Sequence, residues 1–163
     1  MQYTLSILVE NQAGVLSKIT GLFSRRGYNI DSLAVGPTND TMVSRITIVA
    51  DGDEYVVEQI EKQLNKLIPV IKVKRLNESD FISRELVLIK VHCPAAKRSE
   101  IILTAEIMQA KIVDVAQSCV TIEYCENASR VNTLIDLLKP YGIREIVRTG
   151  TVAIDRGTAS VSV

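Results

Sequence analysis

The sequence predicts an α+β fold of two tandem units, each with the element order βαββαβ. Strand-type alternation of apolar residues and helix-type spacing follow one another in this order over residues 1–76, and the same order returns over 84–149. A chain of 163 residues is long enough for two small domains. We therefore expect a first domain over 1–76, a polar linker over 77–83, a second domain over 84–149 and a tail over 150–163.

Periodicity and turn residues place the elements of the first half. We expect strands over 3–9, 30–35, 42–50 and 70–76, and helices over 15–26 and 53–68. Gly27 ends the first helix where a left-handed residue is favoured, and the preceding Arg25 and Arg26 complement the negative helix end. Pro69 ends the second helix, whose apolar stripe runs on through Leu67 and Ile68.

The second half repeats the series. We expect strands over 85–91, 112–115, 120–124 and 143–147, and helices over 99–108 and 131–138. In the tail, a short apolar stretch over 152–154 precedes small polar residues, which we expect to be mobile.

This element order gives a four-stranded antiparallel sheet with both helices on one face, the ferredoxin-like arrangement. In the first domain, Leu8 points to the second face of the sheet, and one sheet edge stays free. Both features favour pairing with another copy of the chain. We therefore expect a homodimer with two symmetry-related pockets, where the first helix and the second strand of different chains meet.

Composition argues against nucleic acid and membrane partners. Acidic and basic residues balance at 19 each, so no net charge attracts phosphate backbones. The densest basic group, Lys72, Lys74 and Arg75, alternates with apolar residues and is typical of the solvent face of an edge strand. No apolar run is long enough to cross a bilayer. Because a strand-like segment starts at once, we expect no targeting leader and a cytoplasmic protein.

The chain shows no arrangement typical of a catalytic centre. Cys93, Cys119 and Cys125 form no C-x-x-C pair and are interpreted as reduced. Cys119 and Cys125 lie six residues apart on one strand face, and we expect both to be small, half-buried hydrophobic residues. The single histidine, His92, has no partner placed by the pattern, and we interpret it as structural. Asp51, Asp53 and Glu54 start a helix, where acidic residues stabilise the dipole. We therefore predict neither intrinsic catalysis nor a metal site.

The turn between the first strand and the first helix is the candidate ligand site. Gly14 stands where the strand turns into the helix, so the amides that follow it are unpaired donors able to bind a carboxylate. Asn11 and Asn29 carry side-chain oxygens able to accept from an ammonium group. Both asparagines and Gly14 are also common turn residues, so a purely structural role stays open. In the second half, residues 93–97 replace this turn and contain no equivalent motif.

An ordered series of segments resembles the ACT domain, an amino-acid-binding βαββαβ module, in the form found in the small regulatory subunits of acetohydroxyacid synthase (acetolactate synthase). The segments that carry the resemblance are 5–11, 14–16, 21–30, 32–33, 44–48, 59–67 and 84–86. The match covers nearly the whole chain and weakens only in the last dozen residues.

The resemblance implies a regulatory function. It implies that the chain activates a catalytic large subunit, which holds thiamine diphosphate, Mg and FAD, and confers feedback inhibition by L-valine in branched-chain amino acid biosynthesis. The expected valine-binding residues are Asn11, Ala13, Gly14, Val15, Leu16, Asn29 and Ile30. The loop over 36–44 and the second domain are candidates for contact with the catalytic subunit.

Three alternatives remain open at this point. An amino-acid-responsive transcription regulator can use the same domain, although the chain shows no helix-turn-helix or basic face. A standalone sensor would bind the amino acid without an enzyme partner. A purely structural dimer would leave the pocket empty, and Gly14→Asp would then change no regulatory property.

Overall fold

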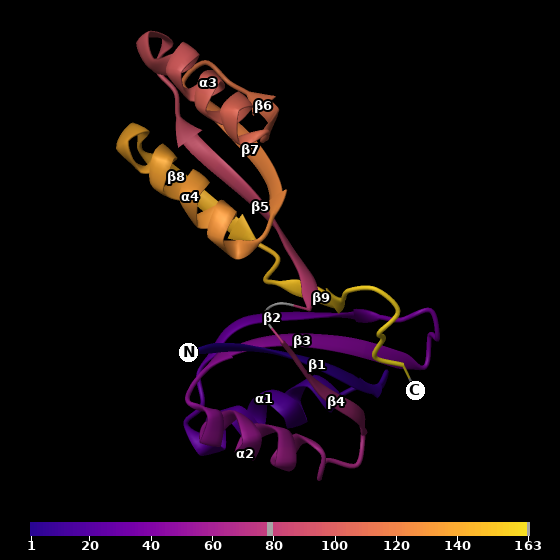
Figure 1. Cartoon of the computed structure of the whole chain (residues 1–163). Coiled ribbons are helices and arrows are strands. Elements are labelled where there is room, and N and C mark those ends of the chain that lie inside the picture. The colour runs from indigo at the N-terminus through magenta and orange to yellow at the C-terminus, as the bar shows by residue number, and fades with distance from the viewer. Residues whose placement is uncertain (78–79, 163) are drawn as a thin grey trace. The chain divides into compact units, whose positions relative to one another are not determined.

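The structure, a computed structural model, describes residues 1–77 and 80–162 (Figure 1). It divides into two compact units, Met1–Ile82 together with Thr151–Val163, and Ser83–Gly150. Each unit contains its own βαββαβ series and sheet, so the predicted fold class is confirmed. Within the predicted linker 77–83, Glu78 and Ser79 lie outside the described residues, and a strand already begins at Phe81.

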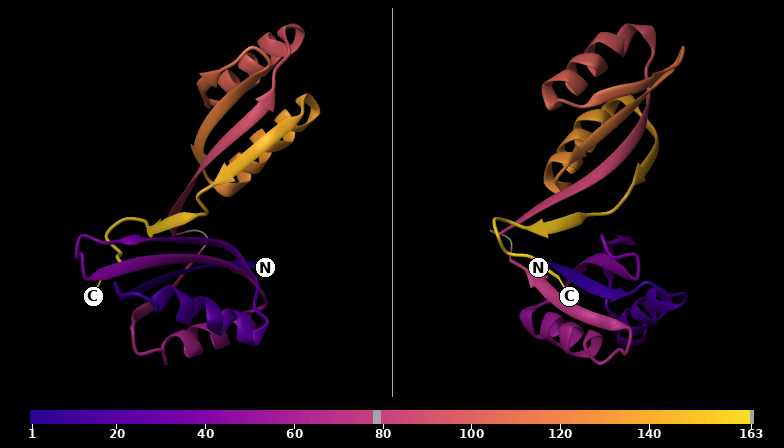
Figure 2. Two further views of the ribbon diagram at one scale, coloured as in Figure 1. Left: turned by 180° about the vertical axis from the view of Figure 1, so that it is seen from behind. Right: turned by 90° about the vertical axis from the view of Figure 1, so that its right-hand side faces the viewer.

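Unit 1 is an antiparallel sheet with two helices on one face (Figures 1 and 2). Its elements are β1 (Gln2–Glu10), α1 (Val15–Arg26), β2 (Ile30–Pro37), β3 (Val43–Asp51), α2 (Glu54–Leu64) and β4 (Val70–Leu76). The strands lie in the order β2-β3-β1-β4, and all neighbours are antiparallel. Strands β2 and β4 are therefore the outer members of this sheet.

The core of unit 1 follows from the two periodicities. Alternate residues of β1, namely Leu5, Ile7 and Val9, are buried toward the helices. The helices contribute apolar stripes at helical spacing, which are Val15, Ile19, Leu22 and Phe23 of α1 and Val57, Ile60 and Leu64 of α2. Gly27 adopts the predicted left-handed conformation, with φ of 68°, and its amide donates to carbonyls of the last turn of α1.

The predicted second helix is too long. The side chain of Asp53 caps α2 by accepting from the amide of Val56, but the helix ends at Leu64 instead of continuing to Ile68. Short-range turn bonds follow, and the side chain of Ile68 is 95% exposed. The residue before a proline avoids the helical region, which explains why the helix ends before Ile68.

Unit 2 repeats the architecture. Its elements are β5 (Phe81–His92), α3 (Arg98–Met108), β6 (Lys111–Val115), β7 (Cys119–Glu126), α4 (Ala128–Leu138) and β8 (Ile143–Arg148), with single-turn 3₁₀ helices at Ala95–Lys97 and Lys139–Tyr141. The strand order is β6-β7-β5-β8, and the first two residues of β5 belong to unit 1. A separate core of apolar residues lies between this sheet and its two helices. Among the described residues, no helix is both long and apolar enough to cross a membrane.

The tail belongs to unit 1 and packs on its sheet, which differs from the expected mobile tail. It contains β9 (Val152–Asp155), and the side chains of Thr151, Ala153 and Val161 are buried. Val161 forms a small apolar cluster with Leu8 and Val43 on the sheet face opposite the helices. The tail thus covers the surface that the sequence assigned to a second copy, and only the free strand edge remains as an argument for a homodimer.

The expected shared solvent face of Lys72, Lys74 and Arg75 is wrong. Lys74 reaches Asp155 of the tail at 2.8 Å, while Arg75 points to the helix side and contacts Glu54 at 2.6 Å. Successive strand residues face opposite sides of a sheet, so these two basic residues stabilise different layers.

Candidate functional site

The chain turns sharply at Gly14, directly before α1. Gly14 has φ of 84° and ψ of −8°, a left-handed conformation that glycine adopts without strain. It occupies the N-cap position, yet no side chain caps the helix and no acidic residue lies in its first turn. A Cβ built at Gly14 would meet no heavy atom within 4 Å, so the space above this turn is open.

The amides behind this turn are available to an anion. The amide of Val15 makes a long bond of 3.4 Å to the carbonyl of Gln12. Across the described residues, the amides of Leu16 and Ser17 donate to no protein group. Unpaired amides and the positive end of the helix dipole together favour a carboxylate. The geometry predicted for the carboxylate end of an amino acid is therefore present.

Asn11 is held beside this turn by the β2–β3 loop. Its backbone amide donates to the carbonyl of Met42 at 2.7 Å, and its side-chain nitrogen donates to the carbonyl of Thr41 at 2.8 Å. These two bonds fix the side chain and leave its oxygen as a free acceptor within the described part of the chain. This is the group that the sequence assigned to an ammonium.

Val15 and Leu16 contribute in different ways. The side chain of Val15 is 5% exposed and belongs to the core, so it does not line the space at the turn and only its backbone amide is left to contribute there. Leu16 is 37% exposed and, with the exposed Ala13, presents apolar surface near the turn.

Asn29 and Ile30 form a second group at the start of β2. The side-chain nitrogen of Asn29 donates to Asp31 at 2.5 Å, and Gln2 donates to the other carboxylate oxygen of Asp31 at 3.1 Å. Ile30 is half-buried and packs against the core. Among the described residues, no protein group donates to the side-chain oxygen of Asn29, as is also true of Asn11.

The two groups lie at opposite ends of the sheet. At one end Glu10, just before Asn11, pairs with Val43, while at the other end Ile30 pairs with Ala50. Strand rise places these two ends about 24 Å apart along β3. A single chain therefore does not bring all the predicted residues into one pocket.

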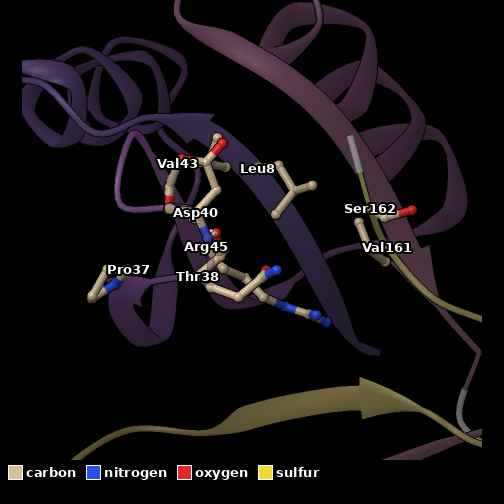
Figure 3. A pocket seen from close by; sticks show the side chains of 9 residues that line it. Leu8, Pro37, Thr38, Asp40, Val43, Arg45, Val161 and Ser162 are labelled. Atoms are coloured by element: carbon tan, nitrogen blue, oxygen red, sulfur yellow. Dashed lines mark hydrogen bonds between the residues drawn. The ribbon is translucent and has the colours of Figure 1, made fainter.

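A cavity missed by the sequence interpretation lies on the other face of the sheet, beneath the tail (Figure 3). It measures about 480 Å³ and is bounded by the 37–40 loop, by Leu8, Val43 and Arg45, and by Val161 of the tail. Burial lowers the pKa of Arg45, which donates to the carbonyl of Ala153 at 2.8 Å. No local sequence signal predicts this cavity. Its walls come from strand β3 and from the tail, which are separated by more than a hundred residues in the sequence.

The remaining chemically active side chains are dispersed. His92 lies beside Arg144, and the Nδ1 atom of His92 is 3.0 Å from the Nη2 atom of Arg144. The three cysteines are free: Cys93 is buried, Cys119 half-buried and Cys125 exposed, so the expectation of a half-buried Cys125 is wrong. In the part of the chain that the structure describes, no three metal-ligating side chains converge.

Two family models match the chain, one for each βαββαβ series. A model for the ACT domain of acetohydroxyacid synthase small subunits matches residues 5–72, and a model described as the small subunit of acetolactate synthase matches residues 84–157. The chain belongs to the acetolactate synthase small-subunit family. The resemblance stated from the sequence is confirmed.

Three relatives of this family match over nearly their full length. The probable acetolactate synthase small subunit of Archaeoglobus fulgidus is 51% identical over 157 residues, which cover 96% of this chain and 98% of that protein. The acetolactate synthase small subunit of Mycolicibacterium smegmatis is 47% identical and covers 98% of this chain and 94% of its own length. The crystal structure of the small subunit from Thermotoga maritima shares 38% identity, with a TM-score of 0.89 over 98% of this chain and 99% of its own.

Proposed function

We propose that this chain is the non-catalytic regulatory subunit of a cytoplasmic acetolactate synthase. In this proposal it binds the catalytic large subunit, raises its activity and confers feedback inhibition by L-valine in branched-chain amino acid biosynthesis. Membership of the small-subunit family supports the regulatory role. The observation that carries the ligand assignment is the open, uncapped start of α1 behind Gly14.

L-valine suits the groups around this turn. The amides of α1 receive its carboxylate, and the free side-chain oxygens of the two asparagines receive its ammonium. Leu16 and Ile30 supply apolar surface for its branched side chain. One methylene is worth only about 1–3 kcal/mol in such a pocket, so leucine and isoleucine are expected to bind as weaker competitors.

The pocket is shared between two chains. Because Asn11 and Asn29 lie at opposite ends of one sheet, a complete site needs the Gly14 turn of one protomer and the start of β2 from its partner. Strand β2 is an outer strand of its sheet, and its Val35 is 51% exposed. A homodimer that joins the two β2 edges about a twofold axis brings the start of each β2 to the end of the other.

Regulation acts through the catalytic subunit. In our proposal thiamine diphosphate, Mg and FAD stay on that subunit and none of them on this chain, whose 36–44 loop and second unit make the contacts that activate it. L-valine inhibits by favouring a less active form of the complex, and a coupling of about 1–3 kcal/mol corresponds to a 5- to 150-fold effect.

Calorimetric titration of the purified chain with L-valine tests the ligand. We expect saturable binding of L-valine and none of D-valine or L-threonine. Gly14→Asp should abolish binding, because its carboxylate takes the place of the ligand carboxylate in open space. Gly142→Asp is the matched control, since Gly142 of unit 2 also has positive φ, 92°, and only the Cβ of His92, at 3.7 Å, lies near its Cβ position, and this variant should bind normally. Equal affinities for the two variants would contradict the site.

Mixing two inactive variants tests the shared pocket. Gly14→Asp and Asn29→Ala homodimers should each bind no L-valine. In a heterodimer one pocket receives both defects and the other receives neither, so an equal mixture that exchanges freely should regain about one quarter of the sites. No regained binding after refolding together would contradict a pocket built from two chains.

A further inference from the structure

The tail crosses the face of the unit 1 sheet that lies opposite the helices. At its start, the amide of Thr151 donates to the side-chain oxygen of Ser32 on β2 at 2.7 Å. Two residues on, the carbonyl of Ala153 accepts from Arg45 of β3 at 2.8 Å. Thr151 and Ala153 are each 7% exposed. The first half of the tail is thus fixed to two different strands.

The second half of the tail reaches the other two strands. The carboxylate of Asp155, which is 7% exposed, accepts from Lys74 of β4 at 2.8 Å. Val161 packs on Leu8 of β1. The segment 151–162 therefore touches all four strands of the sheet, and we call it the strap.

The strap contacts the elements that carry both halves of the proposed ligand site. Ser32 lies on β2 only three residues after Asn29. At the other end, Val161 shares its cavity with Asp40 and Val43, and the side chain of Asp40 accepts from the amide of Met42 (Figure 3). Asn11 in turn donates to the carbonyl of Met42. A conformational change at Asn29 reaches the strap through β2 alone, and one at Asn11 reaches it through the 37–42 loop alone.

The strap is also covalently continuous with unit 2. Strand β8 of unit 2 ends at Arg148, and only Thr149 and Gly150 separate it from Thr151. Docking or release of the strap therefore changes the conformational freedom of the chain directly after β8.

We propose that docking of the strap on the sheet couples occupancy of the ligand site to unit 2. The inference rests on the proposed function and adds the route of regulation. L-valine orders the start of β2 and the loop that holds Asn11, and these are the elements on which the strap docks. By linkage, a ligand that favours the docked strap binds more weakly when docking is prevented.

Two substitutions one position apart give a matched test. Ala153→Lys forces a cation into a buried position beside Arg45 and undocks the strap. Ile154→Lys places the same cation on the outward side of β9, where Ile154 is 55% exposed, and leaves docking intact. A chain that ends at Gly150 removes the strap altogether and serves as the second undocked variant.

Each variant is measured with the catalytic large subunit and alone with L-valine. We expect Ala153→Lys and the shortened chain to bind L-valine about 5-fold or more weakly and to give no inhibition at saturating L-valine, while Ile154→Lys behaves as the parent. In the parent, L-valine should slow hydrogen exchange at the amides of Thr151 and Arg156, which donate to Ser32 and Asp80.

The outcomes separate the two proposals. If the parent binds L-valine but Ala153→Lys is inhibited as strongly as Ile154→Lys, coupling through the strap is wrong and the proposed function stands. If the parent binds no L-valine, the proposed function fails and the strap inference fails with it. If circular dichroism shows that Ala153→Lys has lost the fold of unit 1, the chain that ends at Gly150 takes its place. Inhibition of that chain as strong as that of Ile154→Lys would then overturn the coupling.

Discussion

The two units share an architecture but begin their first helices differently. In unit 1, α1 follows a left-handed glycine and has no side-chain cap. In unit 2, α3 follows Pro94 and a 3₁₀ turn over Ala95–Lys97, and Glu100 lies in its first turn. The carboxylate of Glu100 pairs with Lys97 and adds a negative charge to the positive end of α3, which disfavours a bound anion there. Neither helix has a side-chain cap, so the two starts differ in the left-handed Gly14 of α1 and in the acidic first turn of α3.

The second helices of the two units are alike. Asp53 caps α2 through the amide of Val56 at 2.8 Å, and Asn127 caps α4 through the amide of Arg130 at 3.0 Å. Helices α2 and α4 are thus both capped by a side chain, whereas α1 and α3 are not. Of the two uncapped starts, α1 has no acidic residue in its first turn, and the proposed ligand site rests on this feature.

The largest expected effect is the loss of stability when a core side chain is shortened in one unit or the other. Ile60→Ala in unit 1 and Leu134→Ala in unit 2 each remove a fully buried side chain and should lower the free energy of unfolding by about 2–5 kcal/mol. Native-state hydrogen exchange should show faster exchange mainly in the mutated unit. Leu134→Ala should keep the L-valine affinity of the parent, and a large loss would place part of the site in unit 2.

The next effect concerns the strap. Lys74→Met leaves the buried carboxylate of Asp155 without its cation and should lower the free energy of unfolding by about 1–3 kcal/mol. Arg75→Met breaks the exposed pair with Glu54 on the helix side and should cost less than about 1 kcal/mol. Urea unfolding of both variants measures the difference. Equal losses would mean that the strap contributes little to the stability of unit 1.

Local sequence patterns predicted the order of the helices and of strands β1–β8 and the Gly14 turn, because each depends on neighbouring residues. Gly14, Gly27 and Asp53 occupy the conformations or capping positions expected of them. The end of α2 was misplaced because Ile68 continues the apolar period although the chain has already left the helix.

The place of the tail could not be predicted from such patterns. The bonds of Thr151 to Ser32 and of Ala153 to Arg45 span more than a hundred residues. The strap itself is short and consists of small residues, a few aliphatic ones, one aspartate and one arginine, which form no pattern that names a partner strand. The same limit applies to the candidate site. The sequence shows which residue types surround Gly14. That Asn11 and Asn29 lie at opposite ends of the sheet becomes known only from the strand order and register.

Removing the side-chain caps of α2 and α4 gives a smaller effect in both units. Asp53→Ala and Asn127→Ala each leave a helix amide without its side-chain acceptor and should lower the free energy of unfolding by about 1 kcal/mol. Thermal unfolding followed by circular dichroism measures both. Because neither cap lies at the Gly14 turn, L-valine binding should be unchanged in both variants, and loss of binding in Asn127→Ala would contradict a site confined to unit 1.

The smallest expected effect is a pH dependence that both units share. A hydrogen bond from Lys62 lowers the pKa of Glu58 in unit 1, and one from Lys97 lowers the pKa of Glu100 in unit 2. A carboxylate whose pKa is lower in the folded state stabilises the fold above its unfolded pKa, and this contribution is lost as the pH falls through the folded value. Glu58→Gln and Glu100→Gln should therefore each be slightly less stable than the parent at pH 7 and match it in acid. A difference that persists in acid for Glu100→Gln alone would show that Glu100 also acts through an interaction independent of its charge, such as its contact with Tyr141.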